Sequence, residues 1–194
     1  VVITHEDSAA VCKDVIGTVI EGADIRVMSS KRAEVPNGEN GELWISGPTL
    51  VKGYWDNPEA TQTSFVGGYW QSGDVGSIDI NGHVRVLDRI KDMINRGGFK
   101  IYSAEVESLL TSYNAVLEAA IVGRPCPILG ERVHAFVTVS PLASIQTIEA
   151  ALRDICRENL ADYKCPEVYE ISTIPLPRNA NGKVLKSVLR EAIT

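Results

Sequence analysis

The spacing of apolar residues changes near residue 90, and no other feature of the sequence limits the fold as strongly. Before this point, short segments alternate apolar and polar residues, which is the period of a β-strand. Gly, Pro and Asn residues separate these segments, and Asn81-Gly82 between two of them is a strong hairpin signal. We therefore predict a β-rich first part with a short helix after Pro58. Its predicted strands cover residues 15–20, 23–28, 42–46, 76–80 and 83–87.

Beyond residue 90, helical spacing appears between the strand-like segments. Ser103 is placed to cap a helix over residues 104–110, and the acidic residues of its first turn suit the helix dipole. Two more helices are predicted at 145–161 and 184–193, and strands are predicted at 116–122, 133–139 and 168–172. This alternation is typical of a small α+β domain of about 100 residues.

The charged run Asp88-Arg-Ile-Lys-Asp92 lies where the pattern changes. We place the domain boundary there, which gives a β-rich domain over residues 1–90 and a small domain over residues 91–194. The fold class predicted for the whole chain is α+β, because strands dominate the first part and helices join them in the second.

Composition excludes several classes of protein. The 194 residues include 19 Lys and Arg against 25 Asp and Glu, a net charge of −6. An acidic chain without runs of one sign is poorly suited to bind nucleic acid or an anionic membrane. No apolar stretch approaches the roughly 18 residues that a transmembrane helix needs. The chain starts with neither the basic segment of a signal peptide nor a Met, so we expect it to begin inside a longer protein.

Neither the cysteines nor the histidines have the spacing of a metal site. No Cys-x-x-Cys pair occurs among the four cysteines, which are Cys12, Cys126, Cys156 and Cys165. We interpret them as reduced thiols of a cytoplasmic protein. Metal-ligand spacing is also absent from the three histidines, which are His5, His83 and His134. We therefore assign no metal ligand.

Two segments of the first part could bind a ligand, and each also has a simpler explanation. Asp74 follows Gly73, so its carboxylate is open to approach and could accept both hydroxyl groups of a ribose. An ordinary turn would also explain Gly-Asp. Arg89 and Lys91 lie in the charged junction, where they could belong to a hinge whose arginine reaches a ligand. A solvated linker would have the same composition.

Two glycine-containing segments of the second part have the same ambiguity. Gly97-Gly98 would let the backbone approach a ligand closely, with Lys100 beside it to meet phosphate, or it could form a plain turn. Lys183 follows Gly182 on a loop rich in Pro and Asn, where its charge could stabilise phosphate or a developing oxyanion. A solvated surface lysine is the simpler explanation. The phosphate-loop pattern GxxxxGK[ST] is absent.

The order of the motifs is more informative than any one of them. Seven follow one another along nearly the whole chain: Gly41-Glu-Leu-Trp-Ile-Ser-Gly-Pro, Gly53-Tyr-Trp-Asp-Asn-Pro-Glu-Ala-Thr, Ser72-Gly-Asp, Asp88-Arg-Ile-Lys-Asp, Gly97-Gly, Ala104-Glu-Val-Glu and Pro177-Arg-Asn-Ala-Asn-Gly-Lys. In this order they closely resemble the carboxyl-terminal motifs of the adenylate-forming superfamily. That superfamily includes acyl-CoA synthetases, adenylation domains of nonribosomal peptide synthetases and beetle luciferases.

The resemblance implies an enzyme that uses ATP and Mg²⁺ to convert a carboxylic acid to an acyl-adenylate and pyrophosphate. The acyl group then passes to a thiol and AMP is released. It implies that Asp74 binds both ribose hydroxyls and that Arg89 also contacts the ribose. Lys183 corresponds to the catalytic lysine that bridges the ATP phosphate and the carboxylate. Its charge would stabilise a pentavalent phosphorus transition state without proton transfer.

The resemblance also implies that the small domain changes its orientation between the two half-reactions. Lys91 corresponds to the hinge about which that domain rotates. Gly97 and Gly98 match the loop that lines the pantetheine tunnel in the second step. Lys100 falls where some relatives carry an Arg that contacts nucleotide phosphate, although Phe99-Lys100 replaces the Glu-Asn of many relatives.

Several motifs of the superfamily have no counterpart in this sequence. They are the phosphate loop rich in Ser, Thr and Gly, the adenine-binding motif and most of the acyl pocket, all of which lie upstream in relatives. We therefore expect residues 1–90 to be the β-rich end of the large AMP-binding domain, and residues 91–194 to be its carboxyl-terminal lid. A missing amino-terminal domain would bind most of the ATP and Mg²⁺, so the fragment alone should be inactive.

Within the superfamily we favour an acyl-CoA ligase for a fatty or aryl acid. Lys91 together with Ile101-Tyr-Ser-Ala-Glu-Val-Glu resembles the CoA ligases of such acids. The implied partners are a carboxylic acid, ATP and CoA. Two alternatives remain open: an adenylation enzyme that loads a carrier protein, and a module that binds a partner without catalysis.

Overall fold

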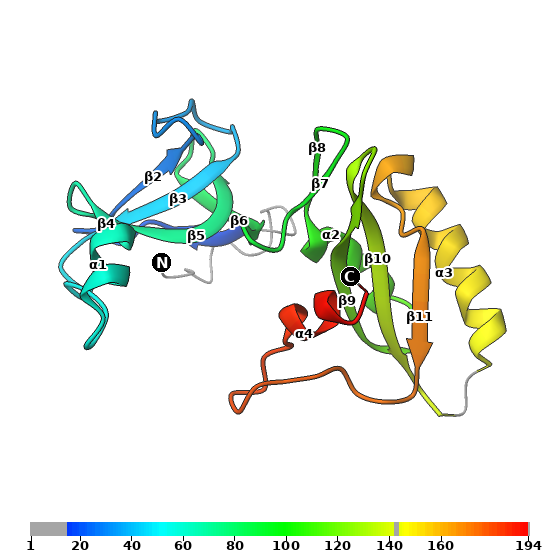
Figure 1. Cartoon of the computed structure of the whole chain (residues 1–194). Coiled ribbons are helices and arrows are strands. Elements are labelled where there is room, and N and C mark those ends of the chain that lie inside the picture. The colour runs from blue at the N-terminus through cyan, green and yellow to red at the C-terminus, as the bar shows by residue number, and fades with distance from the viewer. Residues whose placement is uncertain (1–14, 142–143, 194) are drawn as a thin grey trace. The chain divides into compact units, whose positions relative to one another are not determined.

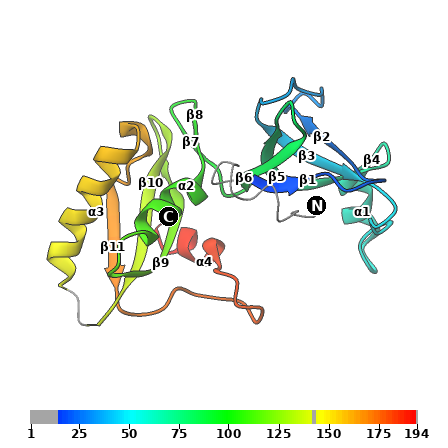
Figure 2. The same ribbon diagram turned by 180° about the vertical axis from the view of Figure 1, so that it is seen from behind.

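The computed structural model describes residues 15–141 and 144–193, and it divides into two compact units, Val1–Lys91 and Asp92–Thr194 (Figures 1 and 2). The sequence places the boundary one residue earlier, between residues 90 and 91. His5 and Cys12, two of the residues without metal-ligand spacing, lie outside the described residues. Among the described residues, no helix is long and apolar enough to cross a membrane.

The first unit is built on one antiparallel sheet. Its strands are β1 (Val15–Thr18), β2 (Asp24–Met28), β3 (Gly41–Ser46), β4 (Phe65–Val66), β5 (Tyr69–Ile78) and β6 (His83–Arg89). The order is β1-β6-β5-β3-β2, and the short β4 pairs with β5. Apolar residues that alternate along the strands, Val27, Leu43 and Val84, form the buried core of this sheet.

The predicted hairpin and helix of the first unit are both present. β5 and β6 pair across the loop 79–82, where Gly82 takes a φ of +82°. The helix α1 (Pro58–Ser64) is capped by Asn57, whose side-chain oxygen accepts the N–H of Ala60 at 3.0 Å. β5 starts at Tyr69, earlier than the expected start at residue 76. Gly73, with a φ of +72°, lies inside this strand and does not end it.

The second unit is built on the long hairpin of β9 (Val116–Cys126) and β10 (Gly130–Val139). On the other side of β10, β11 (Val168–Ser172) runs parallel to it, and the small hairpin of β7 (Ile94–Arg96) and β8 (Phe99–Ile101) joins its first residue. The helices are α2 (Ser103–Thr111), α3 (Ile145–Asn159), the short 3₁₀ turn η1 (Asp162–Lys164) and α4 (Lys186–Glu191). Mixed helices and strands confirm the α+β fold class.

Alternation along β9 and β10 divides the apolar residues between two faces of the sheet. Ile121 and Val133 pack on one face with Val106 of α2 and Leu152 of α3. On the opposite face, Leu189 of α4 packs with three residues of the hairpin, Ala120, Val122 and Phe136. The central hairpin is therefore covered on both faces, which makes it the rigid frame of the unit.

Two local expectations for the second unit are wrong. Ser103 is the first residue of α2, and Tyr102 before it takes the cap position; the buried hydroxyl of Ser103 accepts a hydrogen bond from Lys186 Nζ at 2.6 Å. The last helix covers only Lys186–Glu191, because residues 178 and 184 pair across the preceding loop and Leu185 donates its N–H to the Pro177 carbonyl at 2.8 Å. Residues just after the predicted site lysine are thus part of a loop and not of a helix.

Candidate functional site

Asp74 and Arg89 lie opposite each other on adjacent strands of the first unit. Asp74 is on β5 and Arg89 ends β6, and the two are register partners. Arg89 Nε contacts Asp74 Oδ1 at 3.0 Å, with the carboxylate side chain 26% exposed. Among the described residues, nothing donates to the other oxygen of Asp74. That half-exposed carboxylate therefore has one oxygen held by an arginine and one free to accept a hydroxyl group.

The backbone just before Asp74 is fixed from two sides. The N–H of Gly73 donates to Glu42 Oε1 at 3.2 Å, while the Gly73 carbonyl accepts the N–H of Ile90 at 2.8 Å. The Asp74 N–H donates to Ser72 Oγ at 3.0 Å. Gly73 takes a φ of +72°, which is costly for any residue with a Cβ. The positive φ at this position therefore requires the glycine that precedes the carboxylate.

Glu42 has no role predicted from the sequence, yet it supports the Asp74 segment. Its second carboxylate oxygen accepts Trp44 Nε1 at 3.0 Å, while the first holds Gly73. Glu42 lies in the motif that begins at Gly41, but its contact with Gly73 joins positions 31 residues apart and has no local signal. Lys91, the predicted hinge, is exposed and immediately precedes the second unit.

Lys183 lies on a tight loop of the second unit, between β11 and α4. The side-chain oxygen of Asn179 accepts the N–H groups of Asn181 at 3.0 Å and Lys183 at 2.9 Å. The Asn179 N–H donates to the Lys183 carbonyl at 2.9 Å, and Gly182 turns with a φ of +78°. Lys183 is exposed, and its Nζ has no ion-pair partner among the described residues. The backbone of Lys183 is fixed while its ammonium group remains open to a ligand.

Gly97 and Gly98 form the two-residue turn between β7 and β8. Both have positive φ, +59° and +90°, as this type of hairpin turn requires. The Gly97 N–H donates to the Leu129 carbonyl at 2.7 Å, and the Gly98 N–H donates to Asn95 Oδ1 at 3.1 Å. Lys100 is exposed on β8, where it pairs with Asn95. This turn has no side chain of its own at its tip.

The structure does not bring Lys183 together with the glycine turn. Gly97 is attached to Leu129, in the turn that joins β9 to β10. The loop of Lys183 is attached to the other end of this hairpin, where Arg178 pairs with Glu118. At about 3.3 Å per residue, β9 spans about 26 Å from Glu118 to Cys126. Figures 1 and 2 show β7–β8 at one end of the unit and the loop before α4 at the other.

A thiol with a lowered pKa lies at the glycine end. Arg132 Nε donates to Cys126 Sγ at 3.2 Å. This bond, with the backbone N–H groups of Leu129 and Ile128, lowers the pKa of Cys126 to about 7. Burial instead raises the pKa of Cys156, which lies inside the apolar core. Cys126 is thus partly a thiolate near neutral pH, whereas Cys156 is a thiol.

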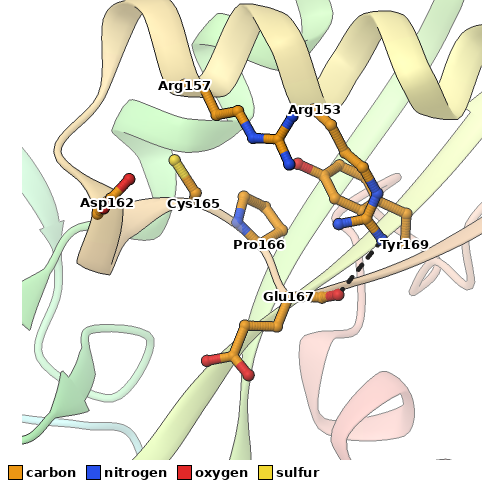
Figure 3. A pocket seen from close by; sticks show the side chains of 7 residues that line it. All are labelled: Arg153, Arg157, Asp162, Cys165, Pro166, Glu167 and Tyr169. Atoms are coloured by element: carbon orange, nitrogen blue, oxygen red, sulfur yellow. Dashed lines mark hydrogen bonds between the residues drawn. The ribbon is translucent and has the colours of Figure 1, made fainter.

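A cavity of about 310 Å³ lies beside α3 and β11, and none of the predicted site residues lines it. Figure 3 shows Arg153 reaching over the ring of Tyr169, and its guanidinium lies 4.6 Å from the ring centre. Arg153 also donates to the Glu167 carbonyl at 3.4 Å and to Glu149 at 2.8 Å. Both arginines that line the cavity are therefore held within the protein, because Arg157 also pairs with Asp154 at 3.3 Å.

Two family models match this sequence, in the order of the two units. The model described as AMP-binding enzyme matches residues 1–55, and the model described as AMP-binding enzyme C-terminal domain matches residues 105–183. The second match ends at Lys183.

Similar proteins include ligases and one amide-forming enzyme. A peroxisomal butyrate–CoA ligase of Arabidopsis thaliana is 43% identical over 173 residues, which are 87% of this chain and 30% of that protein. The o-succinylbenzoate CoA synthetase of Bacillus subtilis, solved with its acyl-adenylate intermediate, has a TM-score of 0.84 at 34% identity, over 91% of this chain and 35% of that one. The amide bond synthetase of Marinactinospora thermotolerans has a TM-score of 0.83 at 32% identity, over 93% of this chain and 37% of that one. This chain spans about a third of the length of these proteins.

Proposed function

The chain belongs to the AMP-binding enzyme family as part of its carboxyl-terminal portion, and we propose that it serves an ATP-dependent acid–CoA ligase. The observation that carries this proposal is the similarity to proteins named as CoA ligases, which extends over about nine-tenths of the chain. In the proposed reaction a carboxylic acid is adenylated by ATP with loss of pyrophosphate. The acyl group is then transferred to CoA and AMP is released.

In the first step, we assign the charged groups of the two units different tasks. Asp74 would accept the ribose hydroxyls through the oxygen that Arg89 leaves open, and Arg89 would contact the same ribose. Lys183 would bridge the α-phosphate and the acid carboxylate, where a positive charge stabilises the transition state. The exposed ammonium group on a fixed backbone suits this task. Mg²⁺ would arrive with ATP and would take its protein ligands mainly from outside this chain.

In the second step, the opposite end of the second unit would act. Gly97 and Gly98 would line the path of the pantetheine arm, because a turn without side chains lets a narrow ligand pass close to the backbone. Lys100 lies at that end and would meet a phosphate in the same orientation of the unit. Lys91 would be the hinge that allows the two orientations. Residues 1–90 would then belong to the large AMP-binding domain and residues 91–194 to its lid.

The similarity to CoA ligases does not identify the acid, so the class of acid is part of the proposal. Butyrate is a short fatty acid and o-succinylbenzoate is an aryl acid, and relatives named for both are similar to this chain. We propose a fatty or aryl acid and a cytoplasmic enzyme, although the butyrate–CoA ligase is named as peroxisomal.

A second candidate differs only in the acceptor of the acyl group. The similarity to an amide bond synthetase favours an amine as the acceptor, with the same adenylation chemistry before it. A carrier protein is the third possible acceptor. All three share the first step, so the acceptor must be tested separately from adenylation.

The test uses the full-length protein that contains this chain. It is incubated with ATP, Mg²⁺ and a panel of fatty and aryl acids, and AMP release is measured with and without CoA. We expect AMP release that depends on CoA and a thioester product that identifies the acid. AMP release that depends on an added amine, with an amide product, would favour the second candidate. Absence of any acyl-adenylate with every acid would contradict the proposed function.

A further inference from the structure

We propose that Glu118 and Arg178 are positioning residues for Lys183, acting through the loop and not on the substrate. This inference rests on the proposed function, in which Lys183 acts during adenylation. No local sequence pattern predicts a role for either residue. Both lie at the end of the β9–β10 hairpin from which the loop of Lys183 extends.

Glu118 attaches the incoming strand of the loop to the sheet. One of its carboxylate oxygens accepts the N–H of Leu176 at 2.9 Å, and the other accepts Arg178 Nη2. These two interactions lower the pKa of Glu118, the Leu176 N–H most and Arg178 next, so the group remains a carboxylate. Its register partner on β10, Thr138, donates to the Ile174 carbonyl at 3.0 Å. The chain is therefore held at residues 174, 176 and 178.

Arg178 extends this attachment to the peptide that carries the lysine. Its Nη1 donates to the carbonyl of Gly182, the residue before Lys183, while Nη2 remains with Glu118. One planar guanidinium thus joins a strand of the rigid hairpin to the tip of the loop. A lysine at this position has a single ammonium group and no such fork, so it could not hold the same geometry on both sides.

The pattern of contacts separates positioning from substrate binding. Both terminal nitrogens of Arg178 are engaged within the protein, which leaves them less free to bind phosphate. Inside the loop, Asn179 already fixes the N–H of Lys183 at 2.9 Å. Arg178 and Glu118 additionally fix the position of the whole loop relative to the sheet. In catalysis a displacement of about 1 Å can reduce a rate by roughly 10²-fold, so this attachment should matter for the first step.

The experiment measures the two half-reactions of the full-length enzyme separately. Adenylation is followed by exchange of pyrophosphate with ATP, and thioester formation is followed with supplied acyl-adenylate and CoA. The variants are Arg178→Lys, Glu118→Gln and the two combined. Arg157→Lys is the matched control, because Arg157 forms an exposed ion pair with Asp154 on α3 of the same unit.

We expect Arg178→Lys and Glu118→Gln each to lower kcat of adenylation by roughly 10-fold, with KM for ATP changed less than about twofold. The double variant should be no slower than the slower single one, because both residues belong to one connection. Thioester formation and the melting temperature should be close to wild type. Arg157→Lys should leave both half-reactions unchanged.

Three outcomes would overturn the inference. The first is wild-type adenylation in both single variants while Lys183→Ala is inactive, which would leave the proposed function standing. The second is a KM for ATP that rises while kcat is kept, which would make Arg178 a direct nucleotide ligand. The third is a full-length wild-type enzyme that adenylates no acid, which would remove the proposed function itself. Glu118→Gln, a nearly isosteric change, keeps the test valid if Arg178→Lys loses stability.

Discussion

The two ends of the β9–β10 hairpin hold their loops by different means. At one end, the turn of Gly97 and Gly98 is fixed by backbone N–H groups, which donate to Leu129 and Asn95. At the other end, the loop of Lys183 is attached through the side chains of Arg178 and Glu118. The first end offers a turn without side chains, and the second end offers the exposed ammonium group of Lys183.

This difference matches what each proposed half-reaction requires. A narrow thiol arm needs a path without side chains, and glycines with positive φ supply it. Phosphoryl chemistry needs a positive charge at a defined place, and a lysine on an anchored loop supplies it. Because about 26 Å of strand separates the two ends, one orientation of the unit cannot serve both steps at one reaction centre. The changes below are meant to disturb one end without the other.

The largest effect should follow the loss of the lysine charge. We expect Lys183→Ala to lower the rate of pyrophosphate exchange in the full-length enzyme by roughly 10²- to 10³-fold, because no other group of this loop replaces the ammonium. Lys52→Ala, a change at another exposed loop lysine, is the control and should keep the rate. Exchange at near the wild-type rate in Lys183→Ala would show that this lysine has no catalytic role.

A change in the first unit should affect both half-reactions, since the nucleotide stays bound through both. Asp74→Asn removes the charge that Arg89 contacts at 3.0 Å and weakens the hydrogen bonds to the ribose. We expect KM for ATP to rise roughly 10- to 100-fold, the range for bonds to a charged group. Asp56→Asn, at an exposed turn residue with a φ of +50°, is the matched control. An unchanged KM in Asp74→Asn would contradict ribose binding by this carboxylate.

A methyl group at the glycine turn should disturb only the glycine end of the hairpin. Gly98→Ala adds a Cβ at a φ of +90°, where no atom lies within 4 Å, so the cost is backbone strain and a narrower path. We expect thioester formation from supplied acyl-adenylate to fall about tenfold. Gly38→Ala has the same open space and a φ of +86° in the first unit. Equal losses in both variants would mean that strain, and not the path of the thiol, causes the effect.

The smallest effect concerns the thiol at the glycine end. Labelling of Cys126, which is 9% exposed, by iodoacetamide should rise with pH through about 7, its pKa beside Arg132. Cys156 is 0% exposed and burial raises its pKa, so it should stay unlabelled there. Arg132→Gln should move the midpoint toward the ordinary thiol value of about 8.5. Because the folded state favours the thiolate, Cys126 stabilises the fold above its unfolded pKa, and this contribution is lost as pH falls through about 7. A midpoint above 8 in the wild type would contradict this environment.

Local patterns predicted the order of the elements, whereas the contacts around the site required the fold. The helix expected at 145–161 is present as Ile145–Asn159, because apolar spacing of this kind is set within the segment itself. The position of Ser103 predicts a cap, but Tyr102 takes that position and Lys186 reaches the Ser103 hydroxyl from 83 positions away. Glu118 and Arg178 are 60 positions apart, and neither has a local pattern that indicates the other.

The division of labour between the two ends can be tested in one crossed measurement. Lys183→Ala and Gly98→Ala are made in the full-length enzyme, and both half-reactions are measured for each variant under the same conditions. We expect Lys183→Ala to lose adenylation but to form thioester from supplied acyl-adenylate, and Gly98→Ala to do the reverse. Loss of the same half-reaction in both variants would contradict the assignment of the two ends to two separate steps.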